Sequence, residues 1–340
     1  MARPWSQQAG HCLGMCKVHR MTKYAIFPIL TAAFLASTAV IISNTTQHAS
    51  AALPDWNFAA AGDWGCTTDT TNTVNNIVNK DPELVLGLGD NAYDDSADCW
   101  FDIIQPIDNK MKIVIGNHDA ENNRLDPYIN HFNLEKQYYS FTYQNVHFLA
   151  LSTDITTRPG STQYNFVKND LADAAANSSI HWIVVYMHRH LYTSPSKPLV
   201  SENYRNALHP LFDQYGVDLV LQGHNHNYQR TYPLKFNSNN SDDPIVTDKN
   251  TSMYSNPENP IFIIAGLGGA SYIHKFTGDQ AEFVAKQFND RNYGFVDIDV
   301  INDGHTLRGT YYANKDLGSG LILDSFTINK TVLSPPPSDK

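Results

Sequence analysis

Five apolar segments of the chain end in side chains that commonly bind metal ions. Each segment has the length and composition of a buried β-strand. The polar residues that follow them are Asp63, Asp90, Tyr93, Asn117, His118, His188, His224 and His226. Because open α/β folds bind ligands outside the carboxyl ends of their strands, we expect these side chains to meet at one sheet edge. Their oxygen and imidazole ligands predict a two-metal centre that shares Asp90.

Each residue alone also has an ordinary structural interpretation. An Asp after a strand often closes a turn or caps a helix, and a single His there is more often a structural hydrogen-bonding group. Tyr93 alone is compatible with simple packing. The coincidence of five such ends in one chain favours the metal site. The glycine turn at 266–269 resembles a phosphate-binding loop, but no lysine follows it directly, and we interpret it as a turn.

The order of the predicted elements is typical of mixed sheets with covering helices. The predicted strands are 57–63, 84–88, 112–115, 138–143, 146–151, 180–186, 217–221, 261–265, 293–299, 307–312 and 321–328. The predicted helices are 69–79, 162–176 and 202–215, and residues 235–258 are expected to form a long surface loop. We therefore predict an α/β fold in which two packed mixed sheets are flanked by helices, a four-layer α-β-β-α sandwich.

The first 51 residues have the features of an export signal. Basic residues precede an apolar run at 25–42, and Ala49-Ser50-Ala51 is typical of a cleavage site. An uncleaved membrane anchor is the alternative, since this run of 18 residues is just long enough to span a bilayer. We predict removal of residues 1–51, a functional domain at 52–330 and a disordered tail at 331–340, which makes the protein secreted or extracytoplasmic.

The charge balance restricts the partners of this chain. The formal net charge of −10 argues against a nucleic-acid or anionic-membrane binder, and loss of residues 1–51 makes it −14, because they hold four basic residues and no acid. An anionic substrate therefore needs a local source of positive potential, which bound metal ions would supply. No stable membrane partner is expected unless the N-terminal segment stays uncleaved.

Two cysteines remain after residue 51, namely Cys66 and Cys99. An even pair in an exported protein indicates a disulfide, which would clamp the loops that follow Asp63 and Tyr93; two free thiols are the alternative. Four Asn-x-Ser/Thr triplets after residue 51 fit a glycosylated surface, and they lie at Asn177, Asn239, Asn250 and Asn329.

In order and spacing, five motifs resemble those of the purple acid phosphatases, which are calcineurin-like metallophosphoesterases. The motifs are Gly62-Asp-Trp-Gly65, Gly89-Asp-Asn-Ala-Tyr93, Gly116-Asn-His118, Val185-Tyr-Met-His188 and Gly223-His-Asn-His226. General metallophosphoesterases have a His in the first motif, whereas here Tyr93 takes its place. The short segment between residue 51 and Asp63 resembles the small, tartrate-resistant-like form of the family.

The resemblance implies a binuclear metal centre with two ligand sets. Asp63, Tyr93 and His226 would bind Fe³⁺, whose tyrosinate bond gives the purple colour. Fe²⁺, Zn²⁺ or Mn²⁺ would bind the second set, with Asp90 bridging the two ions; that set is Asn117, His188 and His224. Such a pair of metals holds phosphate oxygens and lowers the pKa of a bound water, which then attacks phosphorus in line with the leaving alcohol.

The catalytic residues are less clearly marked. The resemblance implies that His118 protonates the leaving oxygen or binds phosphate, although it is also compatible with a role in orienting a ligand. Asp119 would orient His118. Lys197 stands where relatives carry histidine, nine residues after His188. The nearby candidates for contact with phosphate or the leaving group are therefore Arg189 and His190, which are equally compatible with a solvated loop.

The sequence therefore predicts a secreted acid phosphatase that hydrolyses small phosphate monoesters, with phosphoanhydrides as a further substrate class. Two alternatives stay open. One is a phosphodiesterase on the same fold, and the other is a non-catalytic surface protein that binds metal or phosphate. Two residues just past the last motif are weak candidates for the rim of the pocket, Tyr228 and Arg230.

Overall fold

The computed structural model describes residues 53–121, 124–199, 202–314 and 320–331. Its α-helices are α1 (Thr68–Lys80), α2 (Asp98–Ile104), α3 (Asn117–Ala120), α4 (Leu125–His131), α5 (Thr162–Ala176) and α6 (Glu202–Tyr215), with a 3₁₀ turn at Asp108–Lys110. The predicted signal segment at 1–51 and all but the first residue of the predicted tail at 331–340 lie outside these ranges. The predicted domain boundaries therefore stay predictions. Among the described residues, no helix is long and apolar enough to cross a membrane.

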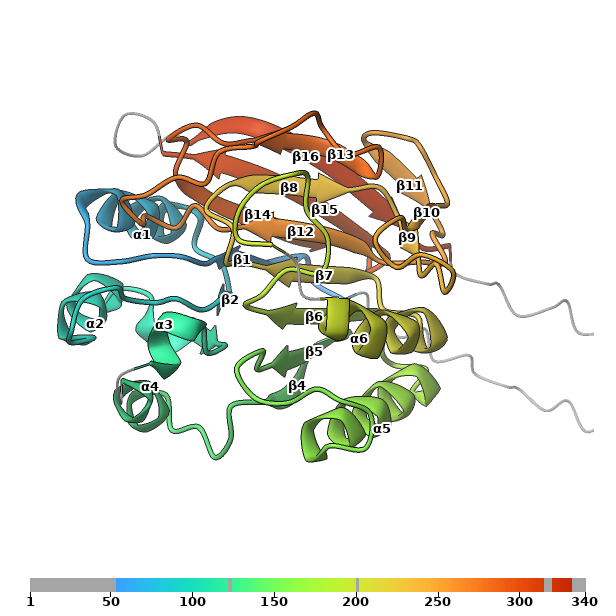
Figure 1. Cartoon of the computed structure of the whole chain (residues 1–340), viewed down its shortest axis with the longest axis horizontal. Helices are drawn as coiled ribbons and strands as arrows, with labels where there is room; N and C mark the ends of the chain where they lie inside the picture. The colour runs from blue at the N-terminus through green and yellow to red at the C-terminus, as the bar shows by residue number, and fades with distance from the viewer. Residues whose placement is uncertain (1–52, 122–123, 200–201, 315–319, 332–340) are drawn as a thin grey trace, which may run out of the picture. The chain divides into compact units, whose positions relative to one another are not determined.

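Two seven-stranded sheets form the centre of the fold (Figure 1). The first sheet has the order β11-β16-β15-β14-β1-β2-β3, with β11 at Met253–Ser255, β16 at Leu321–Asn329, β15 at Thr306–Ala313, β14 at Gly294–Ile301, β1 at Trp56–Ala61, β2 at Leu84–Gly87 and β3 at Met111–Ile113. The second has the order β13-β8-β12-β7-β6-β5-β4, with β13 at Val284–Phe288, β8 at Tyr228–Thr231, β12 at Ile261–Ala265, β7 at Leu219–Gln222, β6 at Trp182–Met187, β5 at Val146–Leu151 and β4 at Tyr139–Tyr143. A separate short pair joins β9 (Leu234–Lys235) to β10 (Ile245–Val246).

Both sheets are mixed, and their parallel strands carry the candidate ligands. Strands β1, β2 and β3 are parallel neighbours in the first sheet, and β5, β6, β7 and β12 are parallel neighbours in the second. The remaining pairs are antiparallel apart from β11 with β16. Parallel strands end at the same edge of a sheet, so the loops after β1, β2, β6 and β7 are brought together.

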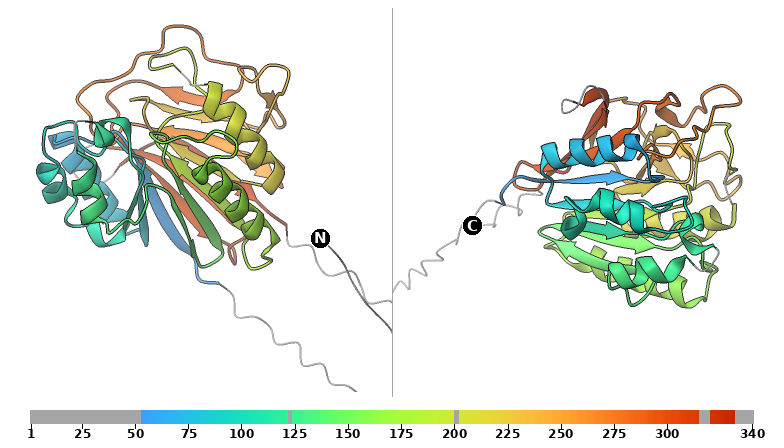
Figure 2. Two further views of the ribbon diagram at one scale, coloured as in Figure 1. Left: turned by 60° about the horizontal axis from the view of Figure 1, so that its bottom comes forward. Right: turned by 90° about the vertical axis from the view of Figure 1, so that its left-hand side faces the viewer.

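Side chains that alternate along β1 show how the layers pack. Phe58 and Ala60 point into the core between the sheets, where Phe58 meets Phe148 of β5 at a ring-centroid distance of 5.1 Å. Ala59 and Ala61 point the other way and pack under α1 and α2. On the far side, α5 and α6 cover the second sheet (Figure 2). This order of helix, sheet, sheet and helix confirms the predicted four-layer fold.

A buried ion pair links the two sheets and corrects one prediction. The guanidinium of Arg230 on β8 donates two hydrogen bonds to Asp324 on β16, at 2.7 and 2.9 Å, and the Tyr228 hydroxyl donates to the same carboxylate at 2.8 Å. Both side chains on β8 are almost fully buried. Tyr228 and Arg230 therefore lie in the core and not at a pocket rim, because the strand that follows the last motif turns inward between its neighbours.

Other differences concern short elements. The segment predicted as a surface loop at 235–258 contains β10 and β11, and β11 extends the edge of the first sheet. The sequence interpretation also missed β8, β13, α2 and α4, which are each seven residues or shorter. Such short elements depend on tertiary packing more than on periodicity. None of the ligand-bearing strands was missed.

Candidate metal centre

Backbone hydrogen bonds join the loops that carry the candidate ligands. The Asp63 amide donates to Gly89 O at 3.0 Å, and Trp64 N donates to Asp90 O at the same distance. On the second sheet, Gly223 N donates to His188 O at 2.9 Å. Asp63, Asp90 and His224 all have positive φ angles, of 58°, 49° and 68°. Non-glycine residues in this region cluster at functional sites, and here all three belong to the candidate ligand sets.

Two glycines let these loops approach each other. A Cβ on Gly116 would lie 2.2 Å from both the backbone nitrogen and the Oδ1 atom of Asp90. A Cβ on Gly266 would lie 2.1 Å from the carbonyl oxygen of Asn225 and 2.6 Å from Oδ2 of Asp63. The turn at 266–269 therefore serves as a close support for the Asp63 loop, in agreement with its interpretation as a turn.

The first predicted ligand set converges at short distances. The Tyr93 hydroxyl lies 2.8 Å from Nε2 of His226 and 3.2 Å from Oδ1 of Asp63, and the latter two atoms are 3.2 Å apart. Nδ1 of His226 lies 2.6 Å from the carbonyl oxygen of Tyr272, so it carries the ring proton. The Nε2 lone pair then faces the oxygens of Tyr93 and Asp63, which is how metal-binding histidines are commonly oriented.

In the second predicted set, a histidine nitrogen again faces other possible ligand atoms, here three of them. Nδ1 of His188 lies 2.9 Å from Leu88 O and so carries the proton, which leaves a lone pair on Nε2. That lone pair faces three further electron-rich atoms, namely Oδ2 of Asp90 (3.2 Å), Oδ1 of Asn117 (3.2 Å) and Nδ1 of His224 (3.1 Å). The ligand atoms of Asp90, His188 and His224 all lie within 4.8 Å of one another. A cation at this point would satisfy all of them, so the residues fit a metal ion.

The electrostatics of the two sets also fit bound cations. Burial opposes the charge of Asp90, but the neighbouring His188 overrides this effect and lowers the pKa of the Asp90 carboxyl. Conversely, burial opposes protonation of His188, and the Asp90 charge raises its pKa to about 9. Burial and the charges of Asp63 and Asp90 raise the pKa of the Tyr93 phenol well above its usual value. A phenolate at Tyr93 therefore requires a strong cation beside it.

Asp119 lies beneath both loops of the first sheet. Its carboxylate is fully buried and accepts hydrogen bonds from the backbone and side-chain nitrogens of Asn91, at 2.9 and 2.8 Å, and from Gly116 N at 2.9 Å. Burial and the charge of Asp90 raise its pKa to about 7, while the donated hydrogen bonds act in the opposite direction. No hydrogen bond between Asp119 and His118 occurs among the described residues. The carboxylate of Glu121 lies 3.9 Å from Nδ1 of His118, and the Asp119 oxygens accept from Asn91 and Gly116, so the contacts give no support to the predicted orienting role of Asp119.

Four candidate ligands line a pocket of about 750 Å³ that His118 also lines, namely Asp90, Tyr93, His224 and His226. The His118 ring lies 4.8 Å from the Tyr93 ring, and its backbone nitrogen donates to Oδ1 of Asp90 at 2.9 Å. Residues that the sequence interpretation did not select form the opposite wall, and they include Tyr272, His274 and Lys275. His274 stacks on His226 at 4.1 Å, and its Nδ1 accepts a hydrogen bond from His226 N. Only the tertiary fold reveals this wall, since no local motif marks it.

Arg189 and His190 do not line this pocket. The Arg189 guanidinium donates to Oδ1 of Asp154 at 3.2 Å, and its Nη1 lies 3.2 Å from Nε2 of His224. His190 is almost fully buried, and neither of its ring nitrogens has a hydrogen-bond partner among the described residues. Both residues line a separate cavity of about 140 Å³, which His224 also lines. Their placement therefore gives no support to the predicted contact with phosphate, whereas Lys197 does line the large pocket.

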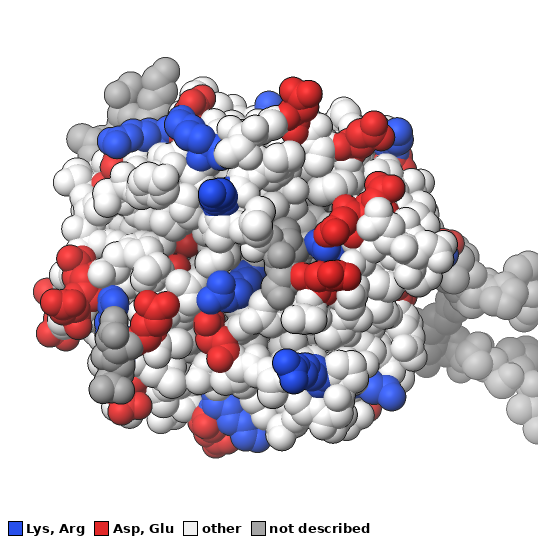
Figure 3. Space-filling model, in the orientation of Figure 1, with Lys and Arg blue, Asp and Glu red and all other residues white. Residues whose placement is uncertain are grey.

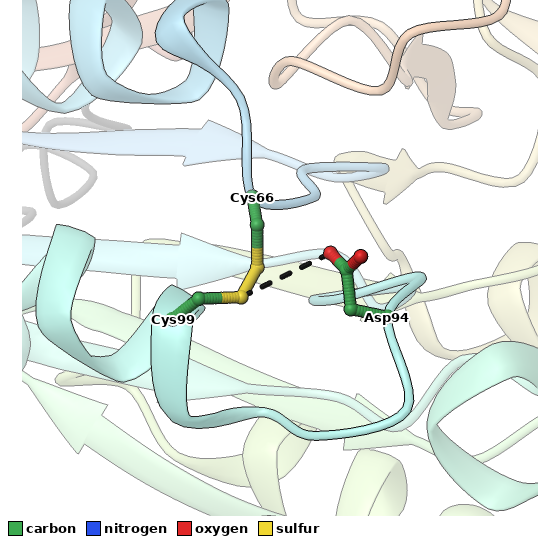
Figure 4. Close-up of side chains that lie close together, drawn as sticks. All are labelled: Cys66, Asp94 and Cys99. Atoms are coloured by element: carbon green, nitrogen blue, oxygen red, sulfur yellow. Dashed lines mark hydrogen bonds between the residues drawn. A yellow bond between two sulfur atoms is a disulfide. The ribbon is translucent and has the colours of Figure 1, made fainter.

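The Cys66–Cys99 disulfide is present and joins the Asp63 loop to α2 (Figure 4). The two Cα atoms are 5.8 Å apart, within the usual range for a disulfide. Oδ2 of Asp94 lies 3.9 Å from the Cys99 sulfur. Because both thiols are used in the bond, we interpret these three residues as a structural clamp next to Tyr93 and not as a metal site.

The fold and the two convergent ligand sets define a metallophosphoesterase. The family model of the calcineurin-like phosphoesterases matches residues 56–228, and the chain belongs to this family. Several of the similar curated proteins are purple acid phosphatases, as the motifs predicted. Membership implies a binuclear metal centre and supports phosphoester hydrolysis.

Two relatives from Arabidopsis thaliana are 28% and 26% identical to the chain. The first is probable inactive purple acid phosphatase 1, and the match covers 76% of this chain and 45% of the relative. The second is purple acid phosphatase 15, and the match covers 62% of this chain and 44% of the relative. The chain thus spans about half the length of these relatives. A purple acid phosphatase from yellow lupin (Lupinus luteus) seeds shares the fold, with a TM-score of 0.66 and 23% identity over 82% of this chain and 54% of the lupin chain.

Proposed function

We propose that the protein is an exported binuclear-metal acid phosphatase that hydrolyses phosphate monoesters. The observation that carries this proposal is the convergence of the predicted ligands as two sets beside one pocket. Fe³⁺ would be held by Asp63, Asp90, Tyr93 and His226, and Fe²⁺, Zn²⁺ or Mn²⁺ by Asp90, Asn117, His188 and His224. When bound, the two metals neutralise phosphate charge and activate a water for attack.

The protein's own residues divide the remaining tasks. In this proposal the two sets share Asp90, whose Oδ2 faces His188 and whose Oδ1 accepts a hydrogen bond from the backbone N–H of His118. The His118 side chain is 39% exposed and lines the pocket, so it can reach the oxygen of a leaving alcohol and give it a proton. The walls formed by 270–277 and 197–198 limit how far a bound ester is exposed to water.

The central experiment measures phosphate release from a monoester and from a bis-ester, with metal-loaded protein. We expect Asp90→Asn to lower kcat at least about 100-fold, because a neutral amide replaces the shared carboxylate. His118→Ala should lower kcat about 100-fold for alkyl esters and much less for esters of acidic phenols, which need no proton. The matched control is His131→Asn, because His131 lies on α4 and pairs with Asp108 away from the pocket.

Two outcomes would replace the proposal. A preference for the bis-ester would indicate a phosphodiesterase on the same fold. A protein that binds metals and phosphate but turns over neither substrate would be a non-catalytic binding protein, and the name of one relative, a probable inactive purple acid phosphatase, makes this the alternative to test first.

Export rests on the N-terminal signal predicted at 1–51, and it agrees with the disulfide. Three of the four Asn-x-Ser/Thr asparagines are exposed, at Asn177, Asn239 and Asn250, whereas Asn329 lies in β16 and accepts a hydrogen bond from Thr306. We expect glycans at the exposed sites only. Mass spectrometry of the secreted protein would check both the cleaved terminus and the modified asparagines.

A further inference from the structure

The three candidate histidine ligands differ in what faces the ring nitrogen that lies away from the other ligands. In His188 and His226 this nitrogen is Nδ1, and it lies 2.9 Å and 2.6 Å from a backbone carbonyl oxygen. A carbonyl oxygen can only accept, so each ring carries its proton there and keeps a lone pair for a metal. In His224 the corresponding atom is Nε2, which lies 3.2 Å from Nη1 of Arg189. A guanidinium can only donate, so His224 is held differently from the other two histidines.

The contact between Arg189 and His224 suits the protein without the second metal and conflicts with the protein that holds it. A neutral imidazole carries one proton, and a donor beside Nε2 favours the form of His224 with its proton on Nδ1. Nδ1 lies 3.1 Å from Nε2 of His188, so it can then donate to that nitrogen. A metal on the second set instead uses the lone pair of Nδ1, which places the proton on Nε2. Two donors would then face each other at 3.2 Å.

Arg189 is held at two points, but its guanidinium has room to turn. The backbone nitrogen of Arg189 donates to the Thr153 hydroxyl at 3.2 Å, and Nη2 donates to Oδ1 of Asp154 at the same distance. The Arg189 side chain is 30% exposed, so neighbouring side chains do not enclose it on all sides. A turn of the guanidinium can therefore carry Nη1 away from His224 while Asp154 keeps its contact with Nη2.

A buried histidine that can accept a hydrogen bond lies beside Arg189. Arg189, His190, Tyr204 and His224 all line the cavity of about 140 Å³ described above. Within the described ranges, neither ring nitrogen of His190 has a hydrogen-bond partner, although the residue is almost fully buried. Burial favours the neutral imidazole, which has one lone pair that can accept. Because an unpaired buried acceptor is costly, His190 indicates a donor that reaches the cavity in another state of the protein.

We propose that Arg189 is a positioning residue with two positions, which the second metal selects. Without that metal, Nη1 donates to Nε2 of His224. With the metal bound, the guanidinium turns into the cavity and donates to His190, while Asp154 holds it in both positions. The proposal rests on the second ligand set of the proposed function above, but not on its catalysis. Since the hydrogen bond to His190 offsets the loss of the one to His224, removal of either partner should change the affinity for the second metal.

The first test titrates Zn²⁺ into protein that holds one equivalent of Fe³⁺, in competition with a chelator. Arg189→Gln should bind Zn²⁺ about tenfold more tightly, because its amide oxygen can accept from Nε2 of His224 and a positive charge is lost. Arg158→Gln removes a charge from the exposed loop after β5, and this control should change the affinity less than about twofold. His190→Phe should weaken binding about tenfold in wild type and less than about twofold in Arg189→Gln, where no guanidinium needs the second position.

Nitrogen NMR of the histidine rings gives a second readout that does not depend on activity. We expect the proton of His224 on Nδ1 in metal-free wild type and on Nε2 after Zn²⁺ is added. A proton on Nε2 in the metal-free protein would overturn the proposal, and so would an equal effect of His190→Phe with Arg189 and with Arg189→Gln.

The two proposals can fail separately. Protein that shows these shifts in Zn²⁺ affinity but releases no phosphate refutes the phosphatase function and leaves the role of Arg189 standing. An active phosphatase whose Zn²⁺ affinity is the same in Arg189→Gln and Arg158→Gln refutes only the role of Arg189. Crystal structures of both forms in which an ordered water, and never the guanidinium, contacts His190 would also refute it.

Discussion

Asp119 offers the sharpest test of how the ligand loops are held. Its buried carboxylate accepts three hydrogen bonds, two from Asn91 and one from the backbone of Gly116. Asn91 lies in the loop that carries Asp90 and Tyr93, and Gly116 directly precedes Asn117. Asp119 therefore connects the ligand loops after β2 and β3 without lining the pocket itself.

The substitution Asp119→Asn has a magnitude that follows from these contacts. An amide retains one acceptor oxygen, so even its best orientation turns the NH₂ group towards one buried donor. A buried donor without a partner costs about 1–3 kcal/mol, and the two remaining hydrogen bonds lose their charge assistance. Loss of a buried negative charge beside Asp90 offsets part of this cost. We expect a net loss of roughly 1–3 kcal/mol, which corresponds to a Tm lower by roughly 2–5 °C for a domain of this size.

The measurement pairs thermal unfolding of metal-free protein with metal affinity by chelator competition. Because the displaced loops hold Asp90 and Asn117, we expect about tenfold weaker metal binding, with kcat nearly unchanged at saturating metal. Glu121→Gln is the control, since Glu121 is two residues away with a side chain that is 55% exposed. If Asp119→Asn matches Glu121→Gln in both Tm and metal affinity, the positioning argument is wrong. A large loss of kcat with unchanged metal affinity would instead place Asp119 in the reaction.

Three further predictions follow from other parts of the structure. Tyr93→Phe should abolish the violet absorption of iron-loaded protein and leave the fold intact by circular dichroism; a colourless, active wild type would refute the ferric–tyrosinate assignment. Replacing Cys66 and Cys99 by serine should destabilise the protein by about 3–4 kcal/mol in denaturant unfolding, from a closed loop with a sequence separation of 33. Burial and the nearby Asp299 raise the pKa of Asp297 from 3.8 to about 7, so its protonated form stabilises the fold at low pH. That stability, at most about 4 kcal/mol, is lost as pH rises from about 4 to about 7, and unfolding midpoints of Asp297→Asn should not show this loss.

The sequence predicted the ligand loops well because each is marked locally. A buried strand that ends in Gly-Asp or Gly-His indicates, within a few residues, both the edge of the sheet and the side chain that can bind a metal. The four layers follow from the same signals, since helices between parallel strands must cover the sheet faces. The strands β14, β15 and β16 could also be predicted, because each is eight or nine residues long and its composition is typical of a strand over that whole length.

What the sequence did not reveal depends on contacts between distant segments. Arg230 is one strand beyond a metal motif, but its partner Asp324 lies 94 positions away on the other sheet. His274 touches His226 across 48 positions. A local sequence pattern contains no information about such distant partners. For this reason the sequence predicts Arg230 at the rim of the pocket, and it does not single out His274. Arg189 and His190 show the same limit, because adjacency to His188 does not determine which cavity a loop residue lines.

The net charge of the chain does not determine the electrostatic potential at the pocket, because that potential depends on where the charged groups lie. The protein carries ten more negative than positive charges, yet its proposed substrate is an anion. On the face drawn in Figure 3, Lys and Arg side chains alternate with Asp and Glu side chains, so their fields partly cancel within the Debye length of about 8 Å at physiological salt. Asp63 and Asp90 are buried and directed at the ligand sets, where bound metals would more than neutralise them. The potential at the pocket is then determined mainly by the metals, together with the two lysines that line it, Lys197 and Lys275.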